Sequence, residues 1–103
     1  MRVFREETFG PLAALVKVKD EAEAISMAND SRYGLGGSVW TKDLDKGRRI
    51  AEKLNAGSIF INALVKSDSR LPLGGIKNSG YGREMAEAGI KEFTNIKTIF
   101  MNQ

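Results

Sequence analysis

The chain has 103 residues, of which 42% are hydrophobic and 28% are charged, so it has the composition of a globular protein of at most one domain. Sixteen basic residues stand against thirteen acidic ones, and the two signs are interspersed, which argues against a nucleic-acid surface. The sequence contains no cysteine and no histidine, which excludes disulfides, thiolate nucleophiles, imidazole bases and the commonest metal ligands.

The first half of the chain predicts two strands separated by a helix. The apolar run Leu12–Val18 is typical of a buried strand. Asp20 predicts the N-cap of a helix, because Glu23 follows three positions later as in an acidic variant of the capping box. That helix is expected to end near Asn29, after which glycines turn the chain and Ser38–Trp40 forms a second strand.

The second half predicts two further helices and two further strands. A helix starts at Thr41 or Asp43, since apolar residues then recur at helical spacing. Ser58–Asn62 is expected to be a third strand. A third helix begins at about Arg83, and Ile96–Met101 closes the chain as a final strand.

This alternation of strands and helices predicts an α/β fold with parallel strands joined by right-handed crossovers. Strands this apolar should be covered on both faces, which gives a three-layer arrangement. Three or four strands leave open sheet edges, and open edges invite pairing with another chain. We therefore expect a piece of a larger parallel sheet, and a homo-oligomer formed through edge strands.

Two features of the sequence concern its location. No run approaches the roughly 18 apolar residues that a membrane span needs. The first residues, MRVFREE, lack the apolar core of a signal peptide. We expect a cytoplasmic protein that contacts neither membrane nor nucleic acid.

The segment Leu71–Glu84, LPLGGIKNSGYGRE, is the most distinctive part of the chain. Its glycines exclude a helix interior or a regular strand; they are Gly74, Gly75, Gly80 and Gly82. The segment is either a functional loop of defined shape or a mobile surface loop. No phosphate cradle is predicted, because Val39 and Met85 occupy the third-glycine positions of the two incomplete G-x-G-x-x-G matches.

Two polar clusters are candidate binding sites. The run Glu6–Pro11 places two carboxylates and an aromatic ring before the first predicted strand. A carboxylate can accept both hydroxyls of a ribose, but the same residues also fit a solvated acidic turn with Phe9 in the core. Ser67–Arg70 lies beyond the third predicted strand, where α/β folds place ligands. A hydroxyl there could bind a substrate carboxylate, although a polar loop without a ligand fits equally.

The chain resembles the C-terminal part of the aldehyde dehydrogenase superfamily in five segments, which in order are EETFGPLAALVKV, NDSRYGLGGSVWTKD, AGSIFIN, LPLGGIKNSGYGRE and EFTNIKTIF. The resemblance covers essentially all 103 residues in the family's order and spacing. Ser67, five residues before Pro72, is further similar to the succinate-semialdehyde dehydrogenase branch.

The resemblance implies roles for four residues. Glu7 matches the glutamate that holds the hydroxyls of the nicotinamide ribose, and Phe9 matches the aromatic residue beside that ribose and ring. Ser67 matches the serine that helps to bind the distal carboxylate of the substrate. Leu73 lies where the family usually has a phenylalanine in the wall of the aldehyde tunnel, so the pocket's shape should differ here.

The resemblance also implies a division of the chain and a cofactor. Residues 1–94 would belong to the catalytic domain, and residues 95–103 would be a terminal strand that pairs between subunits, with Lys97–Met101 as its matching part. The cofactor would be NAD or NADP, and the substrate a small aldehyde such as succinate semialdehyde.

The family's chemistry needs a cysteine thiolate, an oxyanion hole and a glutamate base. Because this sequence has no cysteine, we expect the chain alone to be inactive and to bind no cofactor tightly. The leading interpretation is the C-terminal portion of a semialdehyde-oxidising dehydrogenase. The alternative is a stand-alone truncated module that self-associates or pairs with a full-length dehydrogenase by strand addition.

Overall fold

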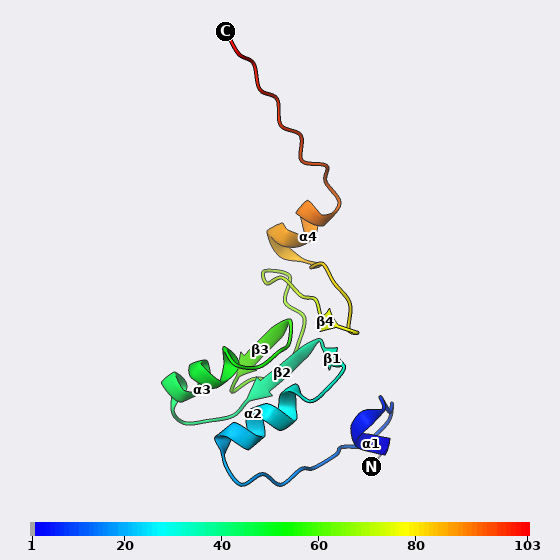
Figure 1. Cartoon of the computed structure of the whole chain (residues 1–103), viewed down its shortest axis with the longest axis vertical. Helices are drawn as coiled ribbons and strands as arrows, with labels where there is room; N and C mark the ends of the chain where they lie inside the picture. Colours follow the sequence, from blue (N-terminus) through cyan, green and yellow to red (C-terminus); the bar gives the residue numbers. More distant parts are fainter. Residues whose placement is uncertain (1) are drawn as a thin grey trace.

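A computed structural model describes residues 2–103, in which short helices and strands are separated by long connections (Figure 1). No helix in this range is long and apolar enough to cross a membrane. The elements in chain order are α1 (Arg2–Arg5), α2 (Glu21–Asn29), β1 (Tyr33–Gly34), β2 (Gly36–Val39), α3 (Leu44–Ala51), β3 (Ser58–Ile61), β4 (Ile76–Lys77) and α4 (Ala86–Glu92).

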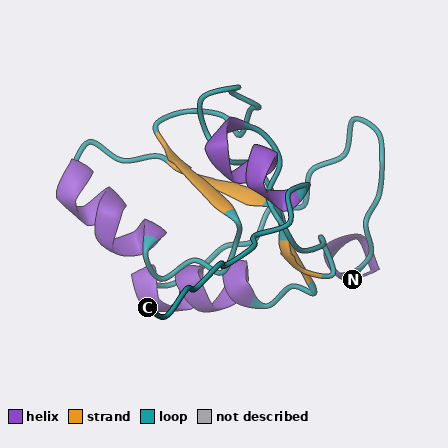
Figure 2. Cartoon of the chain, turned by 90° about the horizontal axis from the view of Figure 1, so that it is seen from above, coloured by secondary structure: helices purple, strands orange, loops and turns teal. Residues whose placement is uncertain are grey.

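The centre of the fold is a β-α-β unit made of β2, α3 and β3. The strands β2 and β3 pair in parallel, with Gly36 opposite Ser58 and Val39 opposite Ile61. Helix α3 contacts both strands and lies beside them in Figure 1, and Figure 2 shows strands in orange at the centre of the molecule with helices around them. Gly47 of α3 is buried against β3, and a Cβ there would lie only 3.1 Å from Ile61 Cγ2. The unit confirms an α/β fold with a parallel strand pair.

The two predicted N-caps are confirmed. The Asp20 carboxylate accepts a hydrogen bond from Glu23 N at 2.8 Å, and Glu23 in turn accepts one from Lys19 N at 2.7 Å. Asp43 accepts from Lys46 N at 2.9 Å and begins α3. Each carboxylate satisfies an amide that the first helical turn leaves without a partner.

The structure contains a short antiparallel strand pair that the sequence patterns did not predict. Tyr33 pairs with Lys77 and Gly34 with Ile76, so β1 and β4 join the predicted turn to the glycine-rich loop. Gly34 N also donates to Ser79 Oγ at 3.0 Å. The loop is therefore attached to the β-α-β unit, and the sheets of the chain are not all parallel.

Two predicted strands are wrong for this structure. Leu12–Val18 and Ile96–Met101 form no strand, because neither segment pairs with another strand of the chain. The third helix begins at Ala86 and not near Arg83, since Met85 and Ala86 have φ of 66° and 49° and interrupt the helical path. The expected contact of residues 95–103 with another subunit stays a prediction.

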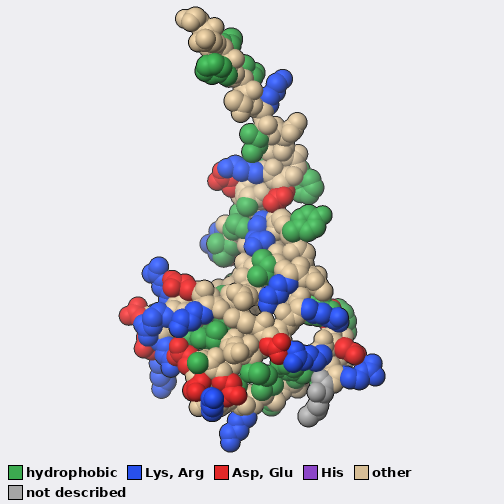
Figure 3. All heavy atoms as spheres, in the orientation of Figure 1, with side chains coloured by type: hydrophobic (Ala, Val, Ile, Leu, Met, Phe, Trp, Pro, Cys, Tyr) green, Lys and Arg blue, Asp and Glu red, His purple; other side chains and the backbone are tan. Residues whose placement is uncertain are grey.

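The shape of the chain is extended. Its radius of gyration is 17.7 Å, whereas a compact domain of this length has about 13 Å. No hydrophobic side chain of residues 2–103 is buried, and Figure 3 shows apolar side chains along the projecting end. The exposed ones include Phe93, at 92%, and Phe100, at 84%. Apolar surface of this extent is typical of a region that packs against further protein.

Candidate functional site

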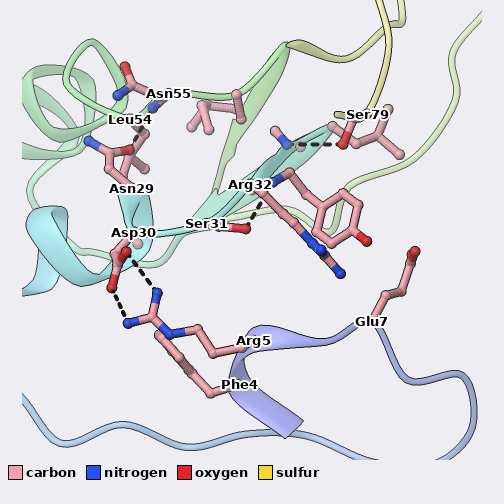
Figure 4. Close-up of a pocket in the computed structure, with 18 of the residues that line it drawn as sticks. Phe4, Arg5, Glu7, Asn29, Asp30, Ser31, Arg32, Leu54, Asn55 and Ser79 are labelled. Carbon is pink, nitrogen blue, oxygen red and sulfur yellow. Dashed lines mark hydrogen bonds and ion pairs between the residues drawn. The ribbon is translucent and has the colours of Figure 1, made fainter. Parts of the chain in front are cut away.

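A cavity lies between the N-terminal arm (residues 2–19) and the body of the fold (residues 20–79). We call it the arm cavity; its volume is about 730 Å³. Its walls come from Phe4–Glu7, from residues 28–38, from Leu54–Ala56 with Ile59, and from Ser79 (Figure 4). Four stretches of sequence that lie far apart thus meet around one space.

One wall of the arm cavity is the turn Asn29–Ser31 at the end of α2. The Asn29 side chain donates from Nδ2 to Lys53 O at 2.8 Å and accepts at Oδ1 from Asn55 N at 2.7 Å. This one amide therefore ties the end of α2 to the connection that leads into β3.

The same turn is held from the glycine-rich loop. Lys77 Nζ donates to the carbonyl oxygens of Asn29 and Ser31, both at 3.0 Å. The backbone of Lys77 is in the left-handed region, with φ of 55°, and its side chain extends across the end of α2. The ammonium thus donates to the last carbonyl of α2, which also accepts from Ser31 N at 2.8 Å, and to the carbonyl two residues beyond it.

An ion pair joins the arm to this turn. Arg5 Nη1 and Nη2 lie 2.8 Å from Asp30 Oδ1 and Oδ2, as Figure 4 shows. The hydrogen bond from Arg5 lowers the pKa of the Asp30 carboxyl, and the positive charge of Lys77 lowers that pKa further. Asp30 is therefore a carboxylate with two cations in its surroundings.

The two cofactor residues predicted in the arm are placed differently. Glu7 lines the arm cavity and makes no hydrogen bond to any of residues 2–103, so its carboxylate oxygens are available to a ligand (Figure 4). Phe9 is 91% exposed and lines neither cavity. The structure thus brings Glu7 to a cavity wall, while Phe9 has no packing partner there.

A smaller cavity, of about 360 Å³, lies over β3 and is called the loop cavity. Leu71–Leu73 and Lys66 are among its lining residues. Leu73 is half-buried and is fixed by two backbone hydrogen bonds with Glu84, of 2.9 and 2.8 Å. Leu73 therefore stands in the wall of the loop cavity, and its place in an aldehyde tunnel stays a prediction.

Ser67, by contrast, is exposed and does not line the loop cavity, although its neighbours Lys66 and Asp68 do. Asp68 is held by Arg70, whose Nε and Nη2 donate to it at 2.9 and 2.6 Å. These hydrogen bonds, with one from Arg70 N, lower the pKa of Asp68 to about 2. The charge of Asp68 is thus compensated within the loop.

The arrangement can bind but supplies no nucleophile of the family's kind. Glu7 and Leu73 line different cavities, and the two cavities share Ile59 of β3. Residues 2–103 hold no cluster of metal-ligating side chains. The Glu7 carboxylate makes no hydrogen bond within residues 2–103 and can accept two hydroxyl donors at once.

Sequence reasoning missed the residues that assemble the arm cavity, which are Arg5, Asn29, Asp30 and Lys77. Their partners lie 24 to 48 positions away, so no local spacing pairs them. The one available signal was the polar run Asn29-Asp30-Ser31 at a predicted helix end, where side chains commonly satisfy backbone groups.

Known proteins resemble the chain over nearly its whole length. It matches the aldehyde dehydrogenase family over residues 1–99. It is 51% identical over 100 residues to an aldehyde dehydrogenase of Paenarthrobacter nicotinovorans, covering 97% of this chain and 22% of the relative. It is 50% identical over 99 residues to a succinate-semialdehyde dehydrogenase (NADP(+)) of Deinococcus radiodurans, covering 96% and 21%.

The fold is similar as well. The structure of succinic semialdehyde dehydrogenase from Streptococcus pyogenes in complex with NADP+ matches with a TM-score of 0.93 at 43% identity, over 97% of this chain and 22% of that one. The chain therefore spans about a fifth of the length of the curated relatives it matches. From the family match and these similarities together, the chain belongs to the aldehyde dehydrogenase family.

Proposed function

We propose that this chain is the C-terminal portion of an NAD(P)-dependent dehydrogenase that oxidises a small aldehyde, such as succinate semialdehyde, to the acid. The observation that carries the proposal is the 43% identity and TM-score of 0.93 to an NADP+-bound succinic semialdehyde dehydrogenase. The cavity positions of Glu7 and Leu73 support it, because they offer a polar and an apolar wall for cofactor and aldehyde.

In this proposal the chain's residues bind and orient, and NAD(P)+ when bound supplies the hydride acceptor. Glu7 accepts the hydroxyls of the nicotinamide ribose, and Phe9 packs beside ribose and ring. Ser67 donates its hydroxyl to the distal carboxylate of the substrate, and Leu73 forms part of the wall of the aldehyde channel. Leucine at that position is smaller than phenylalanine, so the channel wall would have a different shape there.

The proposal assigns no catalytic nucleophile to this chain, because the sequence has no cysteine. Residues 1–94 would lie in a catalytic domain whose further strands complete a three-layer parallel sheet. Residues 95–103 would add a strand to a neighbouring subunit, which would make the enzyme a homo-oligomer. The exposed apolar side chains of Ile96, Ile99 and Phe100 fit such an addition.

The proposal is tested by sequencing the complete reading frame that carries this chain and assaying its product. We expect it to encode a cysteine-containing segment upstream of Met1, and its product to reduce NAD(P)+ in the presence of succinate semialdehyde. A product with that segment and no such activity on small aldehydes would contradict the proposed substrate.

A second candidate function is a stand-alone module that self-associates or pairs with a full-length dehydrogenase. The unpaired edges of the β2–β3 pair and the exposed apolar residues favour it. Size-exclusion chromatography of the purified 103-residue chain separates the two: a stable oligomer supports the module, whereas aggregation or partial unfolding supports a portion of a larger enzyme.

A further inference from the structure

We propose that Asp30 is a positioning residue for the cofactor, because its ion pair with Arg5 holds the N-terminal arm so that Glu7 stays at the wall of the arm cavity. The inference rests on the proposed function, in which Glu7 binds the nicotinamide ribose. It adds a residue that does not touch the cofactor and acts on it through the backbone of the arm.

Asp30 is a rigid anchor because both of its neighbours are fixed. The side chain of Asn29 makes two hydrogen bonds, to Lys53 O and from Asn55 N. The Ser31 hydroxyl accepts from Tyr33 N at 3.1 Å. The Lys77 ammonium spans the carbonyls on either side of Asp30. The turn is thus held by contacts from three separate segments of the body.

The arm has no comparable support of its own. Within residues 2–103, only two polar contacts join the arm to the rest: the Arg5–Asp30 pair, and the junction bond from Lys19 N to Glu23. Helix α1 makes no extensive contact with another helix or strand of the described residues, although Val3 and Phe4 are half-buried. The ion pair is therefore the one long-range polar contact that fixes the far part of the arm on the body.

The connection from the pair to Glu7 is short. Arg5 ends α1, and Glu6 N donates to Arg2 O at 2.8 Å, so the helical turn continues to the residue before Glu7. Glu7 follows Arg5 by only two residues, a reach of roughly 7 Å at full extension. A shift of Arg5 must consequently move the Glu7 carboxylate by a similar amount.

Steady-state kinetics of the full-length enzyme that carries this chain test the inference. We expect Asp30→Ala to raise KM for NAD(P)+ about three- to fivefold, while kcat and KM for the aldehyde change little. The double variant Arg5→Asp with Asp30→Arg restores the pair in reverse and should recover most of the lost cofactor KM. The thermal midpoint should stay near wild type, because the paired side chains are 61% and 49% exposed.

The matched control is Glu21→Ala, which breaks the other exposed ion pair between distant segments, Glu21–Lys46 at 3.2 Å, without touching the arm. It should leave KM for NAD(P)+ unchanged. An Asp30→Ala enzyme with wild-type cofactor KM would overturn the inference, as would an equal rise in the Glu21→Ala enzyme. If wild-type enzyme oxidised no aldehyde with NAD(P)+, the proposed function would be at fault instead.

A second measurement uses the 103-residue chain itself. Backbone ¹⁵N relaxation should show residues 2–9 ordered with the body in the wild-type chain and more mobile in the Asp30→Ala chain. Equal mobility of the arm in both chains would contradict the anchoring role without reference to any activity.

Discussion

The body and the two ends of this chain differ in how their groups are satisfied. In the body, side chains such as Asn29 and Lys77 bond to distant backbone groups, and β2 pairs with β3 along its length. Among the described residues, one long-range polar contact joins the N-terminal arm to the body, and the C-terminal arm (residues 93–103) follows α4 without regular structure. The body is held by hydrogen bonds among its own segments, whereas the residues proposed to bind cofactor and to contact another subunit lie in arms that few polar interactions hold in place.

The largest expected effect concerns the attachment of the glycine-rich loop to the body. A Cβ at Gly57 would lie 1.7 Å from the backbone carbonyl oxygen of Gly74, so Gly57→Ala must displace the loop. We expect a loss of about 3 kcal/mol in the free energy of unfolding, measured by urea denaturation. The control is Ala14→Ser in the N-terminal arm, where the residue is exposed. Equal losses in both variants would contradict the distinction between body and arm.

The next largest effect is expected from removing the Asn29 side chain, which hydrogen-bonds two backbone groups of the body. Asn29→Ala leaves Lys53 O and Asn55 N without their partner, and we expect a loss of about 1 to 2 kcal/mol. Asn95→Ala in the exposed C-terminal arm is the matched control and should change the free energy of unfolding little. Thermal unfolding followed by circular dichroism would check both variants. An Asn29→Ala chain as stable as the wild type would contradict the stabilising role of the Asn29 hydrogen bonds.

A smaller effect concerns the start of α3 in the body. Asp43→Ala removes the hydrogen bond that Lys46 N donates, and it should cost about 1 kcal/mol. Asp43→Asn keeps an accepting oxygen and should lose much less. Urea denaturation distinguishes the two, and equal losses would show that the charge, not the cap, stabilises the helix.

The Asp68–Arg70 pair in the loop before Leu73 should make the stability of the fold depend on pH. Hydrogen bonds from Arg70 lower the pKa of Asp68 from 3.8 to about 2 in the folded chain. A lowered carboxyl pKa stabilises the fold above pH 3.8 and stops doing so as the pH falls towards 2. The Asp68 carboxyl carbon, followed by NMR, should titrate near 2 in the wild-type chain and near its ordinary value in Arg70→Ala. An ordinary pKa in the wild-type chain would contradict the pairing.

The smallest effect on stability is expected in the C-terminal arm. Phe100 is 84% exposed, so Phe100→Ser should change the free energy of unfolding by less than about 0.5 kcal/mol. The same change should reduce self-association if residues 95–103 pair between chains. Sedimentation velocity would show the difference, and an unchanged distribution would argue against the terminal strand as a contact.

The sequence predicted the elements of the body well because their causes are local. Asp20 and Asp43 cap helices through bonds to residues three positions away, and the SIFIN run is a strand in the structure at Ser58–Ile61. The strand pair β1–β4 was missed because it has two residues on each side and includes a glycine. Such a short ladder depends on contacts that Lys77 and Ser79 make with distant residues.

The arms show where local patterns fail. Leu12–Val18 and Ile96–Met101 have the apolar character of strands, but a strand needs a neighbour to hydrogen-bond, and neither finds one among the described residues. Of the four predicted site residues, Glu7 and Leu73 line cavities and Phe9 and Ser67 do not, and the binding roles of all four stay predictions. The resemblance to a family supplied these residues, and no spacing within the chain indicated the Arg5–Asp30 pair.

In the proposed function this chain supplies residues that bind and orient, and its sequence contains no cysteine to act as the nucleophile. The most direct test is NAD(P)H formation from succinate semialdehyde, measured for the purified 103-residue chain and for the complete product of the reading frame that carries it. The account predicts no turnover by the chain alone and clear turnover by the complete product. Measurable NAD(P)H formation by the chain alone would contradict it.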